Sequence, residues 1–368
     1  MSALEAGQEK IIDLFAGPGG LDVAAQWLGV PVVGIEWDKN ACKTRSEAGL
    51  TTEQGDVRKY GPSEGVNHHL WEDATILAGG PPCQTFTVAG GGAGRRVLEH
   101  ILQLVKEMAA DNDVSGALKA LDDDRTGLVL EPLRWALKAH KEGRPYKAIV
   151  LEQVPAVLPI WDATGEALAS IGYKVAAGVL KAEEFGVPQT RRRAVLVAHL
   201  ERQPCLPKRT HKQYRTRSSR DLGNIQGTFD EDLLDCVSME DSLKIATPFF
   251  VVSNYGTGGD PKARGRRRHD EPAATVTGKI LRNRIVDESG VEIRRFDSSE
   301  AGQLQTFPLD FPWSGKDIAQ QIGNAIPPRL GYHILAEALG VAVDKDKLNS
   351  LVSGSWEHQR SAALERRS

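Results

Sequence analysis

The chain has 368 residues, of which 40% are hydrophobic and 26% are charged, and its formal net charge is −3. This composition is ordinary for a globular protein that buries a sizeable core. The net charge does not advertise a nucleic-acid partner, although one basic surface would suffice for binding. The chain begins MSALEAGQEK, which lacks the pattern of a signal peptide, and it has no apolar stretch of the roughly 18 residues that span a bilayer. We therefore expect a cytoplasmic protein with no membrane partner.

The cysteines are too few for a chain of this length to indicate a disulfide framework. They are Cys42, Cys83, Cys205 and Cys236. None of them forms a Cys-x-x-Cys pair, so a zinc site of that kind is not expected and we predict no bound metal.

Short β-rich runs alternate with helical stretches over about the first 200 residues. The predicted strands are Lys10–Phe15, Pro31–Glu36, Ala74–Ala78, Ala148–Glu152, Tyr173–Leu180 and Arg193–His199. The predicted helices are Leu21–Leu28, Val97–Ala110 and Leu128–His140. This alternation predicts an α/β fold with a doubly wound, mostly parallel sheet.

The alternation fades after about residue 203, where glycine, serine and arginine become frequent, and helical patterning returns near residue 298. We predict a catalytic and cofactor-binding domain over 1–203, a smaller loop-rich domain over 204–291, a segment over 292–345 that returns to the first domain, and a tail over 346–368. The last dozen residues of this tail are expected to be frayed.

A glycine-rich turn follows the first predicted strand in the segment IIDLFAGPGG. Glycine lets the backbone approach a ligand closely, and such a turn at the carboxyl end of the first strand is where doubly wound folds bind nucleotides. The turn lacks the Gly-Lys-Ser/Thr of a phosphate-binding loop, which disfavours a nucleoside triphosphate. By itself it is equally a tight connection between a strand and a helix.

Three further residues favour a nucleoside at this turn. Glu36 ends the second predicted strand, where a carboxylate can accept from both ribose hydroxyls. Trp37 offers a ring face for adenine, and Asp56 can accept from the adenine amino group. These features do not separate NAD from S-adenosylmethionine.

Cys83 lies in the segment Gly-Gly-Pro-Pro-Cys-Gln, directly after the predicted strand Ala74–Ala78. The two prolines fix φ and hold the cysteine on a stiff turn. A single cysteine is usually a small hydrophobic residue, but this one stands at the carboxyl end of a strand beside the predicted cofactor site.

Five segments resemble the motifs of the cytosine-5 DNA methyltransferases, in the same order and at that family's spacing. They are DLFAGPGG, GGPPCQTF, LEQV, QTRRR and QIGNAIPP. The resemblance, to the prokaryotic or phage type, covers about residues 10–200 and 294–334. It implies the sheet of the S-adenosylmethionine-dependent methyltransferases, with 204–291 as target-recognition domain. It also implies a monomeric enzyme that acts on double-stranded DNA and releases S-adenosylhomocysteine.

By this resemblance Cys83 is the nucleophile. Attack of its thiolate at carbon 6 of cytosine makes carbon 5 nucleophilic, so that it accepts a methyl group. Glu152 would hydrogen-bond ring nitrogen 3 and must be protonated when the thiolate adds. Arg191 and Arg193 would lie near the base and its oxygen 2, where a guanidinium also favours the thiolate. The cytosine must be flipped out of the duplex to react.

The resemblance and the pattern together indicate a set of cofactor-binding residues. They are Phe15, Gly17, Pro18, Gly20, Glu36, Trp37, Asp56, Val57, Pro81, Leu128, Asn324 and Ala325. The last two would contact the methionine end of the cofactor. Gln153 stands where the family usually has asparagine, and Thr87 where serine is common, which leaves the role of the Gln153 amide open.

Basic residues indicate where DNA would bind, but an arginine that reads a base and one that holds a phosphate look alike in sequence. Arg95 and Arg96 follow a glycine-rich loop, and two threonines in EPAATVTG resemble a turn that faces the flipped base. The candidates are Arg95, Arg96, Arg264, Arg266, Arg267, Thr275 and Thr277, with 215–220 as a further basic run.

Other functions fit the sequence less well. The RNA-directed branch of the same family carries a Cys-Phe-Thr segment that this chain lacks. Amino-group methyltransferases carry a different Pro-Pro-Tyr motif, and a NAD-dependent dehydrogenase has no need of Pro-Pro-Cys-Gln. A catalytically silent DNA-binding regulator would not need Cys83, Glu152 and Arg191 together. Whether a cognate restriction endonuclease accompanies the protein, as in a restriction-modification system, is not written in the chain.

Overall fold

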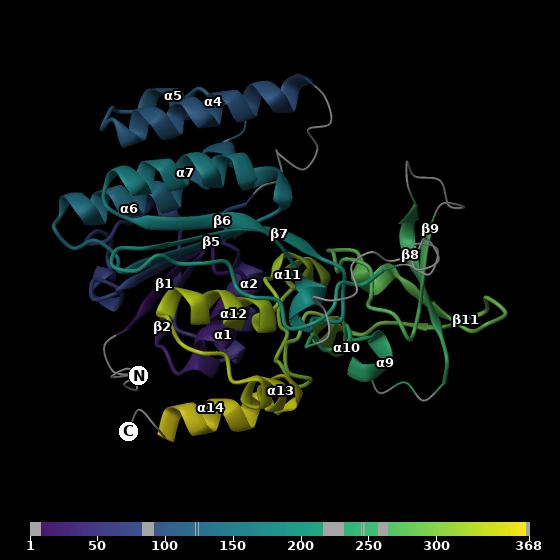
Figure 1. Cartoon of the computed structure of the whole chain (residues 1–368). Coiled ribbons are helices and arrows are strands. Elements are labelled where there is room, and N and C mark those ends of the chain that lie inside the picture. Colours follow the sequence, from purple (N-terminus) through teal and green to yellow (C-terminus); the bar gives the residue numbers. More distant parts are fainter. Residues whose placement is uncertain are drawn as a thin grey trace. The chain divides into compact units, whose positions relative to one another are not determined.

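A computed structural model describes residues 9–82, 92–121, 123, 125–215, 232–243, 245, 247–256 and 264–365. The chain divides into two compact units (Figure 1). Unit 1 comprises Met1–Leu180, Arg192–Pro207 and Tyr332–Val343, and unit 2 comprises Lys181–Arg191, Lys208–Gly331 and Asp344–Ser368.

Unit 1 is built on a seven-stranded sheet with the strand order β3-β2-β1-β4-β5-β7-β6. Its strands are β1 (Ile11–Leu14), β2 (Val32–Glu36), β3 (Thr52–Gln54), β4 (Ile76–Gly79), β5 (Ala148–Gln153), β6 (Lys174–Lys181) and β7 (Arg192–His199). The first five pair in parallel, and β7 runs antiparallel to β5. The predicted doubly wound, mostly parallel sheet is thereby confirmed. The central strands β1 and β4 are buried along their whole length, as expected of strands covered on both faces.

Helices cover both faces of this sheet. Figure 1 shows α6 and α7 on one face and α1 on the other, with α4 lying outside α7. The helices of this unit are α1 (Gly20–Leu28), α2 (Lys39–Glu47), α4 (Gly92–Ala109), α5 (Ser115–Lys119), α6 (Glu131–Lys141), α7 (Leu158–Ser170) and most of α12 (Pro328–Leu339). The predicted helix over Leu128–His140 is a 3₁₀ turn, η3 (Thr126–Leu130), followed by α6.

Unit 2 contains a four-stranded antiparallel sheet with the order β11-β10-β8-β9. Its strands are β8 (Phe250–Gly256), β9 (Arg264–Arg268), β10 (Arg284–Val286) and β11 (Glu292–Arg295). Its helices include α9 (Met239–Ser242), α10 (Ser298–Leu304) and α11 (Ile318–Asn324). One face of the sheet supplies Val251 and Ile285 to a core that also contains Leu304 and Ile322. The structural division therefore differs from the predicted one, because α10 and α11 share a core with this sheet.

The predicted tail forms two helices, α13 (Lys345–Ser353) and α14 (Trp356–Glu365). Trp356 is only 2% exposed and packs edge-on against Phe311, with ring centroids 5.4 Å apart. The carboxylate of Asp310 accepts from the Trp356 backbone N–H at 2.6 Å and caps α14. The structure contradicts the expectation of a frayed end over residues 357–365, because the buried Trp356 and the Asp310 cap hold the start of α14.

None of the helices in the described parts of the chain is both long and apolar enough to cross a membrane.

Candidate active site

The glycine-rich turn after β1 adopts backbone conformations that most residues avoid. Phe15, Gly17 and Gly19 have φ angles of 63°, 55° and 105°. For an aromatic residue such as Phe15 a positive φ is a strained exception, of the kind that gathers at ligand sites. A Cβ placed on Gly17 would meet no atom within 4 Å, so the turn borders open space. Pro18 is buried behind it, and α1 begins directly afterwards at Gly20.

Glu36 ends β2 beside this turn. Its two carboxylate oxygens accept from the backbone N–H groups of Gly17 and Asp38, both at 2.7 Å. Burial raises the pKa of Glu36, and the same two hydrogen bonds oppose that rise. Trp37 follows with its side chain 63% exposed, an unusual placement for so large an apolar ring. The turn, an acceptor and an open aromatic face thus lie together in unit 1.

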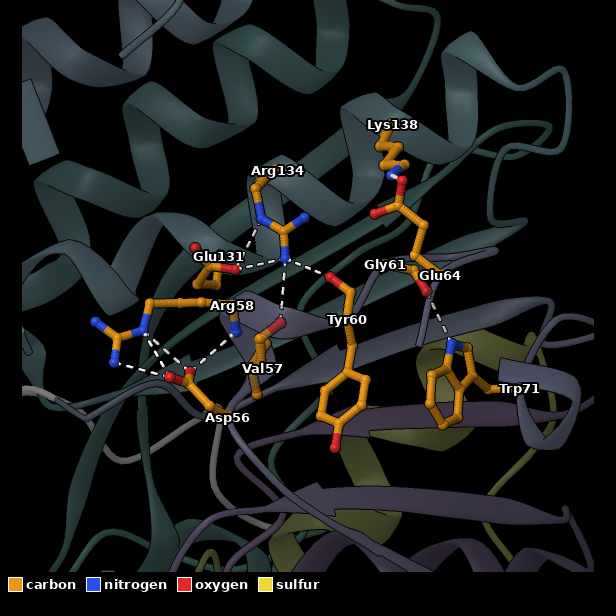
Figure 2. A network of polar contacts seen from close by, with 10 residues as sticks. All are labelled: Asp56, Val57, Arg58, Tyr60, Gly61, Glu64, Trp71, Glu131, Arg134 and Lys138. Carbon is orange, nitrogen blue, oxygen red and sulfur yellow. Dashed lines mark hydrogen bonds and ion pairs between the residues drawn. The ribbon is translucent and has the colours of Figure 1, made fainter. Parts of the chain in front are cut away.

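Asp56 and Val57 lie in the turn that follows β3 (Figure 2). The Asp56 carboxylate accepts from the backbone N–H of Arg58 at 3.1 Å and forms an ion pair with its guanidinium at 2.8 Å. Burial raises the pKa of Asp56, but the hydrogen bonds from Arg58 outweigh it and leave the pKa below its usual value. Asp56 is therefore an ionised acceptor at neutral pH, and Val57 beside it is buried.

A buried ion pair between α1 and α2 supports the glycine-rich turn. Arg45 on α2 donates to both carboxylate oxygens of Asp22 on α1, at 2.8 and 2.6 Å, and neither side chain is exposed. A Cβ on Gly34 would lie 2.0 Å from the Arg45 guanidinium, so glycine is required there. Removing one partner of such a pair strands a buried charge, which typically costs about 3–5 kcal/mol. Sequence reasoning missed this pair, because nothing in the chain marks residues 23 positions apart as neighbours.

Asp13 on β1 is 4% exposed. Burial, reinforced by the nearby Asp22 carboxylate, raises the pKa of Asp13 well above its usual range, although Arg45 opposes the rise. In the unfolded chain this carboxyl ionises near pH 4. Between that pH and its raised pKa, the folded protein holds a proton that the unfolded chain has lost. Stability therefore falls as pH rises through this window, by about 1.4 kcal/mol per pH unit at most.

We expect Asp13→Asn to remove this pH-dependent cost. The thermal midpoint of the variant, measured without cofactor, should match the wild type near pH 4 and exceed it increasingly from pH 5 to 8. Asp73→Asn, at an exposed carboxylate paired with Lys10, serves as control and should show no such divergence. Parallel curves for Asp13→Asn and the wild type would contradict the expectation.

Glu152 and Arg193 lie on the neighbouring strands β5 and β7. The Nε of Arg193 lies 2.6 Å from Oε1 of Glu152, and both side chains are largely buried. A Cβ on Gly80 would be 3.8 Å from the other Glu152 oxygen, so this carboxylate faces the segment that leads into Pro81 and Pro82. Cys83, Thr87 and Gly90 lie outside the described residues.

Gln153 supplies a contact that the sequence left open. Its side-chain amide donates to the carbonyl oxygen of Pro81 at 2.5 Å. Its own oxygen accepts from the Val154 backbone N–H at 2.6 Å. The glutamine therefore fastens the proline turn to β5 and keeps a use for the amide despite the additional methylene group.

Leu128 lies in η3, partly buried.

Arg191 belongs to unit 2 and is fully enclosed there. Its guanidinium donates to the carbonyl oxygens of Val276, Gly323 and Ala325, at 2.9, 2.9 and 3.1 Å. It thereby ties the turn that carries the two predicted threonines to the segment that carries Ala325. Asn324 beside it is exposed and accepts from the Gln320 amide at 2.7 Å.

Two buried glutamines extend this arrangement, and sequence reasoning missed their role. The amide of Gln189 donates to the Leu304 carbonyl and to the Gln305 side chain, both at 2.7 Å. Its oxygen accepts from the Val276 backbone N–H at 3.0 Å. Thr275 donates to the carbonyl oxygen of Thr190 at 2.6 Å, while the Thr277 hydroxyl accepts from the Lys279 backbone at 3.3 Å. The sequence signal that could have indicated this role is that Gln189 belongs to the QTRRR segment.

The four-stranded sheet of unit 2 carries arginines on the face opposite its core. The register places Arg295, Arg284, Val252 and Arg266 in one row across β11, β10, β8 and β9. Directly paired residues point to the same face, so the three arginine side chains share it. The core residues Val251 and Ile285 point to the other face.

Aromatic rings accompany these arginines. The guanidinium of Arg266 lies 3.8 Å from the centroid of the Phe250 ring. Arg267 points to the other side of β9 and lies 4.6 Å from the Tyr214 centroid. No carboxylate among the described residues forms an ion pair with Arg266 or Arg284. Arg264 begins β9.

Arg95 and Arg96 are exposed on α4 in unit 1. Arg95 forms a loose ion pair with Glu99 at 3.8 Å. Surface pairs of this kind contribute little, so neither guanidinium is committed to the fold.

Comparison with known proteins agrees with the resemblance of the five sequence segments. The model of the C-5 cytosine-specific DNA methylase family matches residues 9–107 and 112–339. Type II methyltransferase M1.HphI of Haemophilus parahaemolyticus is 27% identical, covering 92% of this chain and 87% of that protein. Type II methyltransferase M.NgoBI of Neisseria gonorrhoeae is 28% identical, covering 86% of this chain and 89% of that protein.

Solved structures share the fold. The crystal structure of the S. pombe Dnmt2 methyltransferase has a TM-score of 0.60 at 16% identity and covers 90% of this chain and 98% of its own. A putative DNA modification methyltransferase encoded within an E. coli prophage has a TM-score of 0.56 at 17% identity, with 90% of this chain and 99% of its own covered. The family match over most of the sequence is decisive, and the chain belongs to the C-5 cytosine-specific DNA methylases.

Proposed function

We propose that this DNA (cytosine-5) methyltransferase works through a covalent adduct of Cys83 and a flipped cytosine in duplex DNA, assisted by Glu152 and Arg193. The observation that supports the proposal is the buried Glu152–Arg193 pair, which faces the Gly80–Pro82 segment immediately before Cys83. S-adenosylmethionine supplies the methyl group and leaves as S-adenosylhomocysteine.

In the proposed reaction the Cys83 thiolate forms a bond to carbon 6 of the cytosine, and the displaced electron pair moves toward ring nitrogen 3 and carbon 5. Glu152 delivers a proton to nitrogen 3 as the thiolate adds, which offsets the charge there. Arg193 orients Glu152 and donates to oxygen 2 of the base. Once carbon 5 carries its methyl group, a base removes the carbon 5 proton. The electron pair of that C–H bond restores the ring double bond, and the bond to sulfur breaks.

The residues around the glycine-rich turn fit an adenosine-bearing cofactor. Glu36 is a half-buried acceptor beside open space, and the Trp37 ring has an exposed face. We assign the ribose hydroxyls to Glu36, the adenine face to Trp37 and the adenine amino group to Asp56. The strained turn would let the backbone approach the methionine part closely. We assign Arg191 a supporting role within unit 2, since its donors serve backbone carbonyls.

Bisulfite sequencing of host DNA is the sharpest test of the function. Expression of the wild type should protect cytosines in one short sequence context from conversion, and an empty vector should not. In vitro, tritiated S-adenosylmethionine should label duplex DNA. Labelling of transfer RNA with no labelling of duplex DNA would overturn the assignment of the substrate.

The recognition of DNA falls to unit 2 in this proposal, through the arginine face of its sheet. Its guanidiniums would hold phosphates, because arginine contacts phosphate through paired donors. The relatives are named type II methyltransferases, so we further propose a monomer that acts in the cytoplasm beside a cognate restriction endonuclease. Co-expression of neighbouring genes and size-exclusion chromatography test these points.

We expect the double variant Arg266→Ala/Arg284→Ala to bind a DNA duplex at least about tenfold more weakly at 0.15 M salt. The plot of log affinity against log salt should also lose about two units of slope, because two phosphate contacts no longer release counterions. Fluorescence polarisation measures both quantities. Lys347→Gln, an exposed charge on α13, is the control and should bind as the wild type does. An unchanged slope in the double variant would exclude this face.

A further inference from the structure

Arg134 on α6 reaches the turn that follows β3 (Figure 2). Its Nη2 donates to the carbonyl oxygens of Val57 at 3.1 Å and Tyr60 at 2.7 Å. The turn is a single 3₁₀ turn, Val57–Lys59, in which the Tyr60 backbone N–H donates to the Val57 carbonyl at 3.2 Å, and Arg134 adds a second donor to that carbonyl. The guanidinium therefore fixes its carboxyl end.

Glu131 holds that guanidinium in place. The Nε of Arg134 donates to a Glu131 carboxylate oxygen at 2.8 Å, and Glu131 is buried one helical turn earlier on α6. A guanidinium fork bound to a buried carboxylate loses its rotational freedom before it meets the carbonyls. Arg134 is thus pre-oriented toward the turn.

The turn that Arg134 fixes carries the proposed adenine contacts. Asp56 caps its amino end and Val57 is its first residue. Leu128, a further predicted contact, lies in η3, which runs directly into α6. The Glu131–Arg134 pair consequently joins two chain segments that are far apart in sequence and that both carry predicted adenine contacts.

We propose that Arg134 is a positioning residue for S-adenosylmethionine, which acts through the Asp56–Val57 turn. The inference rests on the proposed cofactor role of that turn. Arg134 holds the backbone of the turn at Val57 and Tyr60. The Asp56 carboxylate, held by Arg58 within the same turn, meets the adenine.

The rest of the segment has fastenings of its own. Lys138, one turn further along α6, forms an ion pair with Glu64, and the Trp71 indole donates to the Gly61 carbonyl at 2.9 Å (Figure 2). The segment therefore stays attached when Arg134 is changed. Lys138→Ala is a matched control, because it removes a cation from the same face of the same helix without touching the turn.

The experiment measures cofactor affinity and steady-state kinetics on duplex DNA. Arg134→Gln is made together with Glu131→Gln, so that no buried carboxylate is left without its partner. We expect the Kd for S-adenosylhomocysteine, by calorimetry, and the KM for S-adenosylmethionine to rise about 10- to 100-fold. The kcat at saturating cofactor should fall less than threefold and the KM for DNA should stay unchanged. Arg134→Lys should recover part of the loss, since one ammonium cannot reproduce the fork.

A double-mutant cycle tests whether Arg134 acts through the turn. Asp56→Ala alone should weaken cofactor binding, and adding the Arg134 change should weaken it little further. Additive losses would mean that Arg134 acts independently of Asp56.

Each failure points to a different premise. If Asp56→Ala weakens cofactor binding but the Arg134 variant binds cofactor as the wild type does, the positioning role is wrong and the proposed function stands. If Asp56→Ala binds cofactor normally, the assignment of the turn to adenine is wrong. A fall in kcat together with a rise in the KM for DNA, each as large as the change in cofactor affinity, would show a general structural defect. The same effect from Lys138→Ala would show it too.

Discussion

We expect Cys83→Ser to abolish methyl transfer to DNA, with a loss of at least about a thousandfold in rate. Serine keeps the size and the hydrogen-bonding capacity of the side chain, but its hydroxyl is a far weaker nucleophile than a thiolate near neutral pH. Without addition at carbon 6, carbon 5 of cytosine is too weak a nucleophile to attack the methyl group. The measurement is transfer of tritium from labelled S-adenosylmethionine to duplex DNA.

The control for this variant is Cys205→Ser, which changes an exposed free cysteine and should label DNA as the wild type does. A mechanism-based probe sharpens the result. Duplex DNA with 5-fluorocytosine at the target blocks loss of the carbon 5 substituent, so the wild type should form a complex that survives denaturing electrophoresis. Cys83→Ser should form none. Equal labelling by both proteins would refute Cys83 as the nucleophile.

We expect Glu152→Gln and Arg193→Ala each to lower kcat by about 10²- to 10⁴-fold. Glutamine cannot supply a proton to ring nitrogen 3, and without Arg193 the Glu152 carboxyl loses the ion pair at 2.6 Å that orients it. The two residues act as one unit, so the kcat of the double variant should be only slightly lower than that of the less active single variant. Pre-steady-state single turnover on saturating DNA measures the chemical step directly.

Arg192→Ala is the matched control, because Arg192 is the exposed neighbour of Arg193 in the same arginine run. It should retain the wild-type rate. Affinity for S-adenosylhomocysteine should be unaltered in the Glu152 and Arg193 variants, which separates a lost chemical step from a lost fold. If Arg192→Ala falls as far as Arg193→Ala, the run acts as a basic patch and the ion pair has no special part.

The arginine run shows how far sequence reasoning reached. QTRRR predicted that Arg191 and Arg193 act together at the base, since both match one family motif. The structure gives them different surroundings. Arg193 pairs with Glu152, whereas Arg191 donates to three carbonyl oxygens of unit 2. Alternate residues of an extended segment point in the same direction only where the strand is regular, and β7 begins after Arg191, at Arg192.

The far end of the chain shows the opposite limit. Residues 346–365 have little apolar periodicity, yet they form α13 and α14. The order of α14 depends on the packing of Trp356 against Phe311 and on Asp310, which caps this helix from 46 residues away. No local pattern announces either partner.

The amino-acid sequence alone predicted the type of reaction and the class of fold. The alternation of apolar strands and amphipathic helices is a local property, so it predicted the parallel sheet. The Gly-Pro-Gly-Gly turn and the Pro-Pro-Cys-Gln segment are local as well, and each requires particular residues at fixed spacing.

The contacts between residues far apart in the sequence follow from the folded structure alone. Arg45 and Asp22 support the cofactor turn, Gln153 holds Pro81, and Arg134 fixes the Asp56–Val57 turn. These contacts join residues from about 20 to almost 80 positions apart, and their formation depends on strand order and helix packing. A short motif carries the chemistry because its atoms are covalently close, whereas the supports of that motif are close only after the chain has folded.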